Sequence, residues 1–232
     1  MSTRERTVEA VLFDIDGTLV DSNYLHVDTW DRAFAEAGRP IEIWRIHRAI
    51  GMDSAELLKT LLGDDPDGVA ERAKELHGEY YKAEAGRLRP FDGAAELVRS
   101  LIARGIAVVL ATSAPEDELE ILLQVLGLSK GEVSTTSSGD VDTAKPEPGI
   151  IQAALGKAGA DPARAVMVGD TIWDVIAAER AGVSTIGVRS GGIAEEELTG
   201  AGAIEVHDGT RALLEGNEGT VLGRLLARPE RR

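Results

Sequence analysis

Two aspartates, Asp14 and Asp16, follow an apolar run that starts at Val11, and Gly17 comes directly after them. Side chains two residues apart on a strand project from the same face, so the two carboxylates are predicted to lie side by side. Repulsion at that spacing pushes the two pKa values apart, which leaves one acid ionised while its neighbour carries a proton. A nucleophile beside a general acid/base needs such a pair. A strand that ends in an Asx turn also explains a bare D-x-D-G, so the assignment depends on further motifs.

Hydroxyl and amino groups follow later in the chain. Thr112 and Ser113 close an apolar run and precede Pro115, where a helix is expected to begin. The start of a helix offers unpaired N–H groups to an anion, although Thr-Ser before proline is equally a helix cap. Lys145 precedes Pro146, and proline locks φ, so the lysine is predicted to be held in place. A lone lysine is otherwise most often a solvated surface residue.

Two further aspartates, Asp170 and Asp174, follow a short apolar strand that ends in Gly169. On the helix expected after that strand they lie one turn apart and share a face. Carboxylate oxygens are the ligands that Mg²⁺ prefers, so the pair is a candidate metal site. An Asp cap followed by a solvated Asp is the alternative.

In this order, the four motifs resemble the signatures of the haloacid dehalogenase superfamily of phosphohydrolases. The resemblance covers nearly the whole chain, from about residue 8 to residue 203. It implies that Asp14 attacks phosphorus and that Asp16 is the acid/base. It also implies that Thr112, helped by Ser113, hydrogen-bonds a phosphate oxygen. Lys145 is implied to pair with the phosphate and with the charge of the nucleophile.

The resemblance further implies a Mg²⁺ cofactor held by Asp14, the backbone carbonyl of Asp16, and Asp170. Asp174 is implied to be the second acid of that site, acting through water or by orienting its neighbours. A free Asp titrates at about 3.9, so Asp14 is expected to be ionised near neutral pH and to form an aspartyl-phosphate. Asp16 is expected to protonate the leaving alkoxide and then to activate water against the acyl phosphate.

A smaller set of residues is predicted to bind the substrate. Gly17 and Thr18 are expected to offer backbone N–H groups to the phosphate. His26 matches a histidine that contacts the acid/base Asp in capped relatives, including β-phosphoglucomutase-like proteins, and a surface or half-buried helix histidine is an equal alternative. Arg48, and with it Arg45, is predicted to bind a distal anionic group, although exposed helix arginines are common.

The spacing of the motifs predicts where an insertion lies. Asp16 and Thr112 are 96 positions apart, whereas Thr112 and Lys145 are 33 apart, so a cap domain fits in the first gap. Apolar residues at helical spacing predict cap helices over 23–37, 41–50, 54–62 and 69–84. We therefore predict a helical cap at residues 21–88, in the gap between the first and second motifs that the family calls the C1 position, and a core at residues 1–20 and 89–232.

The rest of the chain alternates between strand and helix, which predicts an α/β fold: a Rossmann-like parallel sheet with helices on both faces. The predicted strands are 106–111, a short piece near 133, 165–168, 184–188 and 203–206. The predicted helices are 94–104, 116–126, 149–159 and 172–181. A turn is predicted at 64–68, and a hinge that returns the chain to the core at 88–93.

Composition narrows the class of protein. The 232 residues include 25 basic and 40 acidic side chains, and a net charge of −15 argues against a nucleic-acid partner. The absence of cysteine excludes disulfides and thiol chemistry. No apolar stretch is long enough to span a bilayer, so we expect no membrane partner and a cytoplasmic location. A monomer and a homodimer both remain open.

The function predicted first is a Mg²⁺-dependent phosphatase for a small phosphorylated metabolite. Phosphoglycolate, a sugar phosphate and a nucleotide monophosphate all remain open as substrates. A β-phosphoglucomutase-like mutase is the second candidate, and Ser54 counts against it because mutases usually carry a basic residue three positions after the glycine that matches Gly51. Asp16 and Asp170 count against a haloacid dehalogenase. A non-catalytic binding protein with the same fold is the last alternative.

Overall fold

A six-stranded parallel sheet organises the computed structural model, which describes residues 8–64, 68–140 and 145–230. The strands are β1 (Ala10–Phe13), β4 (Ala107–Ala111), β5 (Ser134–Thr136), β6 (Ala165–Gly169), β7 (Ser184–Val188) and β8 (Glu205–His207). Their order in the sheet is β5-β4-β1-β6-β7-β8, and every neighbouring pair is parallel. The two strands that carry motifs after β1 therefore flank it directly, as β4 on one side and β6 on the other.

Alternating side chains of β1 explain why this run is apolar throughout. Val11 and Phe13 pack into one hydrophobic cluster, whereas Ala10 and Leu12 pack into another on the opposite face. A parallel sheet covered on both faces needs such continuous apolar strands. All the side chains of β1 are fully buried.

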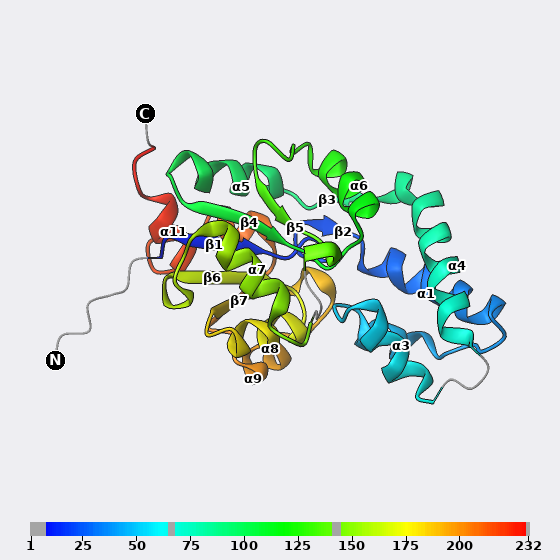
Figure 1. Ribbon diagram of the computed structural model, residues 1–232. Coiled ribbons are helices and arrows are strands. Elements are labelled where there is room, and N and C mark those ends of the chain that lie inside the picture. Colours follow the sequence, from blue (N-terminus) through cyan, green and yellow to red (C-terminus); the bar gives the residue numbers. More distant parts are fainter. Residues whose placement is uncertain (1–7, 65–67, 141–144, 231–232) are drawn as a thin grey trace.

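Helices cover both faces of the sheet (Figure 1). On one face lie α5 (Ala94–Ala103), α6 (Glu116–Leu126), α10 (Thr210–Leu214) and α11 (Val221–Leu226). On the other lie α7 (Gly149–Ala158) and α8 (Ile172–Arg180), while α9 (Glu195–Ala201) packs against α8 and the last two strands. Short 3-10 turns connect these elements at Ala85–Arg87, Ser138–Asp140, Pro162–Arg164 and Arg189–Gly191. The α/β fold class predicted from the sequence is confirmed.

Four helices form an insertion beyond one end of the sheet, at the right of Figure 1. They are α1 (Asn23–Glu36), α2 (Ile43–Ala49), α3 (Ser54–Leu62) and α4 (Val69–Ala83). Their apolar faces form a cluster of their own, which we call the insertion cluster; it includes Trp30, Phe34, Ile46 and Leu57. The chain enters the insertion after β2 (Val20–Asp21) and leaves it before β3 (Arg89–Pro90), and these two strands pair antiparallel.

Predicted and observed elements differ mainly at the C-terminal end of the chain. The last strand begins at Glu205 rather than residue 203, because Gly202, with φ +115°, ends α9 and Ala203 still donates its N–H to Leu198. Helices α9, α10 and α11 were not among the predicted elements. Residues 65–67 of the predicted turn lie outside the described residues. No helix in the described ranges has the length and apolarity needed to cross a bilayer.

The insertion cluster yields a stability prediction. Ile46 is fully buried in it, so Ile46→Ala leaves a cavity and is expected to lower the free energy of unfolding by about 2–4 kcal/mol. Ile43 lies on the same helix and is 56% exposed, so Ile43→Ala is expected to change it by less than about 0.5 kcal/mol. Urea denaturation of the wild type and both variants measures the difference, and equal losses would contradict the packing.

Candidate active site

The predicted motifs converge at the carboxyl ends of three adjacent strands. Asp14 follows β1, Thr112 follows β4 and Asp170 follows β6. In the sheet register Phe13 lies opposite both Leu110 and Val168, so these strands end at the same level. Ligands of open α/β sheets bind at such strand ends, where the strand order reverses.

Lys145 is the buried cation of this site. It is 2% exposed, its Nζ donates a hydrogen bond to Asp14 Oδ1, and it lies 2.6 Å from Asp174 Oδ1. Asp174 also accepts hydrogen bonds from the N–H and the hydroxyl of Thr171, at 3.0 and 2.7 Å, in a capping box at the start of α8. Although burial opposes a charged lysine, the charges of Asp14 and Asp174 raise the pKa of Lys145, so it stays protonated.

Asp170 is fully buried and is held by two donors from the other end of the chain. The Thr18 hydroxyl donates to Asp170 Oδ1 at 2.9 Å, and the Asn23 amide donates to Oδ2 at 2.7 Å. A Cβ at Gly17, whose φ is +76°, would lie 2.4 Å from Asp170 Oδ2, and one at Gly191 would lie 1.7 Å from it. Glycine at both positions therefore allows the backbone to approach this carboxylate.

The donor set of this cluster fits a divalent metal ion. Asp14, Asp170 and Asp174 are buried, and one oxygen of each lies within 4.8 Å of the others. Burial, and then repulsion from neighbouring carboxylates, raises the pKa of Asp170 well above its ordinary value. Asn23 Oδ1 is buried and has no hydrogen-bond partner among the residues that the structure describes. Three acids beside one lysine leave excess negative charge, which a hard cation with oxygen ligands would offset.

The pKa values of Asp14 and Asp16 are pushed apart, but in the reverse of the predicted order. Burial above all, with repulsion from Asp174 and Asp16, raises the pKa of Asp14 to about 7 despite Lys145. Burial acts in the same direction on Asp16, but hydrogen bonds and charge from His26, together with the Ser22 hydroxyl, lower its pKa. Without a further cation, Asp14 is therefore only partly ionised near neutral pH, whereas a free Asp would be fully ionised. A metal ion beside Asp14 would restore the ionised form.

His26 contacts Asp16, as predicted, and a second histidine supports it from α4. His26 Nε2 lies 3.3 Å from Asp16 Oδ1, and His26 Nδ1 lies 3.1 Å from His77 Nε2. Burial opposes protonation of His26, but Asp16 raises its pKa, whereas burial and then the charge of His26 lower that of His77. A charged His26 thus donates from both nitrogens and His77 accepts. Tyr81 and Trp30 stack on the two histidines.

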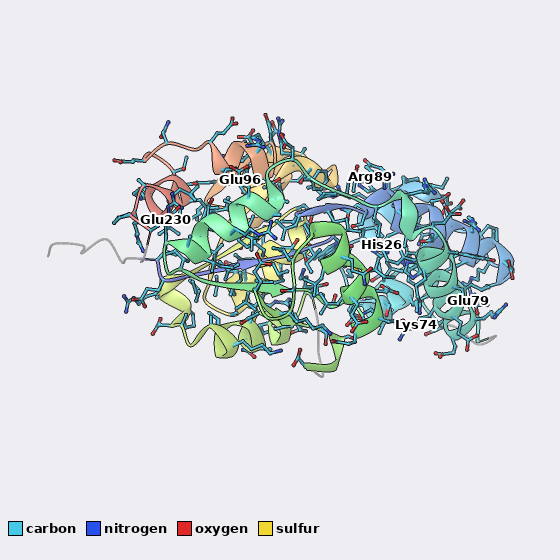
Figure 2. The ribbon with its side chains drawn as sticks, turned by 90° about the horizontal axis from the view of Figure 1, so that it is seen from above. His26, Lys74, Glu79, Arg89, Glu96 and Glu230 are labelled. Atoms are coloured by element: carbon cyan, nitrogen blue, oxygen red, sulfur yellow. The ribbon has the colours of Figure 1, made fainter. Side chains whose placement is uncertain are left out.

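A cavity of about 670 Å³ opens between the strand ends and the insertion. Figure 2 shows His26 at this junction, with Lys74 and Glu79 on α4 beside it. The predicted site residues on its wall are Asp14, Asp16, His26, Thr112, Ser113 and Lys145. Those behind the wall or away from it are Gly17, Thr18, Arg48, Asp170 and Asp174. The cavity thus collects the predicted nucleophile, acid/base, hydroxyls and lysine on one surface.

The predicted phosphate donors Gly17 and Thr18 need correction. The N–H of Gly17 donates to the carbonyl of Val20 at 2.8 Å, and that of Thr18 donates to the carbonyl of Ile15 at 3.2 Å. Both groups are therefore used to close the loop after β1. The N–H groups of Ile15 and Asp16 donate to no residue in the described part of the chain, and they are the donors this loop keeps.

Arg48 also lies elsewhere than predicted. Its guanidinium pairs with Glu197 on α9, and Arg45 pairs with Glu42 on the surface. Because the side chain of Arg48 joins the insertion to the core outside the cavity, it is not placed to bind a substrate anion. Two further contacts join the same parts: the backbone of Gly51 lies against the side chain of Thr171, and the N–H of Asp53 donates to the carbonyl of Lys145.

Several residues of the site carry no motif in the sequence. His77 lies in α4 and Glu118 in α6, two helices that were predicted only from apolar spacing. Asn23 is the first residue of α1. A histidine on the apolar face of its helix, beside Leu76 and one turn from Ala73 and Tyr81, was the signal that could have pointed to His77. Thr171, between two predicted aspartates, could have been recognised as a helix cap.

The fold and the site define an α/β enzyme with an acidic centre suited to a metal ion. The chain is 30% identical over 210 residues to the phosphoglycolate phosphatase of Rhodospirillum rubrum, which covers 86% of this chain and 87% of that protein. A solved hydrolase from Pseudomonas syringae is 36% identical, with a TM-score of 0.85 over 88% of this chain and 95% of that one. A putative beta-phosphoglucomutase from Bacteroides vulgatus, at 21% identity, shares the fold with a TM-score of 0.82 over 97% of this chain and 92% of that one.

Residues 8–182 match the haloacid dehalogenase-like hydrolase family, and the chain belongs to it. The family predicted from the motifs is therefore confirmed, as is the predicted enzyme class, a hydrolase of the phosphatase kind.

Burial of neutral His77 predicts a pH dependence of stability. The unfolded chain binds a proton at this histidine near pH 6.5, whereas the folded chain does not, so His77 makes the protein less stable as the pH falls below about 6.5. His77→Gln is expected to destabilise by about 1–3 kcal/mol at pH 7.5. That difference should shrink by up to about 1.4 kcal/mol per pH unit below 6.5. Urea denaturation at pH 7.5, 6 and 5 measures it, and a constant difference would refute the burial argument.

Proposed function

We propose that this protein is a Mg²⁺-dependent phosphatase that hydrolyses a small phosphomonoester through an aspartyl-phosphate on Asp14. The observation that carries the proposal is the buried cluster of Lys145 with Asp14, Asp170 and Asp174 at the wall of a cavity that also presents Asp16. The phosphatase named among the relatives acts on a small phosphorylated acid, which supports this substrate size.

In the first half-reaction, an oxygen of Asp14 forms a bond to phosphorus while the bond from phosphorus to the ester oxygen breaks. Asp16, which its lowered pKa leaves ionised, passes a proton from His26 to the leaving alkoxide. His26 Nε2 holds a proton 3.3 Å from Asp16 Oδ1, which supplies the acid that the low pKa of Asp16 alone would lack. In the second half, Asp16 takes a proton from water and returns it to His26, the water oxygen bonds to phosphorus, the bond from phosphorus to Asp14 breaks, and phosphate leaves.

Positive and hydrogen-bonding groups around Asp14 stabilise the transferring phosphoryl group. Lys145 keeps its charge beside Asp14, and the Thr112 hydroxyl lies on the same wall and accepts the N–H of Ala114 at 3.0 Å, which orients it. The free N–H groups of Ile15 and Asp16 add donors from the loop after β1. Such preorganised charge and positioning supply most of the catalysis in phosphoryl transfer.

Asp14, Asp170 and the backbone carbonyl of Asp16 are the proposed Mg²⁺ ligands, with Asp174 as a further acid that Lys145 and Thr171 hold in place. When bound, the ion neutralises charge on the phosphate and on Asp14. Mg²⁺ is commonly bound by one or two carboxylates, with further oxygen ligands from a substrate phosphate.

The insertion is proposed to be a cap over this chemistry, with boundaries at residues 21–88 and a core of residues 1–20 and 89–232. Its helices supply His26 and His77 to the site and form one side of the cavity. Closure over a substrate would exclude bulk water from the aspartyl-phosphate. Mutase chemistry with the same residues remains the second candidate, and Ser54 on the cavity wall in place of a basic residue disfavours it.

Phosphate release tests the proposed reaction. A panel of small phosphomonoesters with Mg²⁺ is expected to show turnover, and Asp14→Asn is expected to lower kcat at least about 1,000-fold because the nucleophile is lost. Glu147 is two residues from Lys145 and forms an exposed ion pair with Arg180. Glu147→Gln is therefore the matched control and should keep turnover. Full activity of Asp14→Asn would refute the mechanism, and activity only as conversion of one sugar phosphate to another, with a bisphosphate activator, would establish the mutase.

Metal binding can be measured without turnover. Mg²⁺ at about 100 times its Kd is expected to stabilise the wild type by about 2.7 kcal/mol. Asp170→Asn should abolish most of this gain and, in EDTA, should be as stable as the wild type or more so, because it removes one of the buried like charges. Asp208→Asn, at an exposed acid, should keep the gain. Thermal unfolding with Mg²⁺ and with EDTA decides, and equal gains in all three proteins would place the ion elsewhere.

A further inference from the structure

Glu118 is a buried carboxylate of the cavity that the proposed mechanism does not use. It is 7% exposed, it lies on the cavity wall, and its side chain has no hydrogen bond or ion pair to any residue in ranges 8–64, 68–140 and 145–230. Burial raises its pKa, which the charge of His26 partly offsets. Because this carboxylate lines the cavity, a ligand that supplies a donor there would gain a charge-assisted hydrogen bond.

The position of Glu118 points to the leaving-group side of the site. It lies in the first turn of α6, directly after the loop of Thr112 and Ser113, and it faces α4 of the insertion. A Cβ at Gly78 would lie 4.0 Å from Glu118 Oε1, so α4 passes close to this carboxylate at the boundary between the insertion and the core. A phosphomonoester with its phosphate between Asp14 and Thr112 would extend its alcohol part past this carboxylate.

Two lysines of the cavity wall, Lys82 and Lys145, are already engaged with other carboxylates. Lys82 Nζ lies 2.6 Å from Asp117, and Lys145 is held by Asp14 and Asp174 at the phosphate end. Further carboxylates on the cavity wall come from α4, at Glu71, Glu75 and Glu79. Lys74, on the same helix and labelled in Figure 2, also lines the cavity and is exposed to solvent. A second anion on the substrate would therefore meet like charge at Glu118, whereas a hydroxyl would meet an acceptor.

We propose that Glu118 is a specificity-determining residue that accepts a hydrogen bond from the leaving group and selects phosphomonoesters of neutral, hydroxyl-bearing alcohols over those with a second anionic group. This inference rests on the proposed phosphatase function. It makes a polyol or sugar monophosphate the preferred class and a phosphorylated carboxylic acid a poor substrate. Sites built around a buried hydrogen-bonding group discriminate strongly, because the wrong substrate leaves that group unpaired.

Matched substrates test the selection. Glucose 6-phosphate and 6-phosphogluconate share a carbon skeleton but differ in net charge, as do glycerol 3-phosphate and 3-phosphoglycerate. The wild type is expected to favour the uncharged alcohol of each pair at least about tenfold in kcat/KM, and Glu118→Gln to reduce that ratio at least about tenfold. Glu120→Gln, an exposed acid on the same helix, should leave the ratio unchanged. A wild type that prefers the carboxylates, or a ratio unaffected by Glu118→Gln, overturns the inference.

Binding to Asp14→Asn protein separates this inference from the proposed function. Calorimetry gives the Kd of each matched substrate without turnover. If the wild type hydrolyses nothing, the phosphatase proposal fails, and the Kd ratios with and without Glu118→Gln still decide whether this residue selects the ligand. Hydrolysis without any difference in ratio overturns the role of Glu118 alone.

Discussion

The contact on which the rest of the site depends is the burial of one lysine among carboxylates. Lys145 reaches Asp14 and Asp174 from a loop far along the chain, and it is nearly inaccessible to water. Three buried acids would repel one another without it, and burial, with repulsion from Asp174 and Asp16, still raises the pKa of Asp14 to about 7 with it. The protein therefore keeps an electrostatic imbalance at the strand ends, which a metal ion and a phosphate together can relieve. The excess buried charge lowers the stability of the fold, but it also favours the binding of a cation that the reaction would use.

Side chains of the insertion, and not its backbone alone, contact the acidic groups at the strand ends. His77 in α4 contacts His26 in α1, and His26 contacts Asp16 after β1. Trp30, which belongs to the insertion cluster, stacks on His77. The packing of the insertion thus affects the orientation of Asp16, the proposed acid/base. A movement of the insertion would alter the protonation of Asp16, because His26 is the main cause that lowers its pKa.

Much of the fold and of the chemistry could be predicted from the sequence, because periodic apolar runs and the motif order are local signals. Strand–helix alternation predicted the sheet, and four short motifs predicted the residues that gather around Asp14. What failed needed three-dimensional information. The free N–H groups of the loop depend on how Gly17 and Thr18 close it, the partner of Arg48 lies on α9, and the pKa of Asp14 depends on burial. Glu118 and His77 carry no motif because their neighbours come from other elements.

The pairing of β2 with β3 has a consequence for how such enzymes can diverge. Val20 pairs with Pro90 and Asp21 with Arg89, so the two ends of the insertion leave the core side by side. The span between those ends is fixed by two strands, whatever number of residues lies between them. Chain added or lost in the helical part away from Asn23, His26 and Asp53, which contact the core, would thus leave the core carboxylates and Lys145 in place while it changes the cavity wall. A single scaffold could in this way acquire new specificities by exchange of one contiguous stretch of gene.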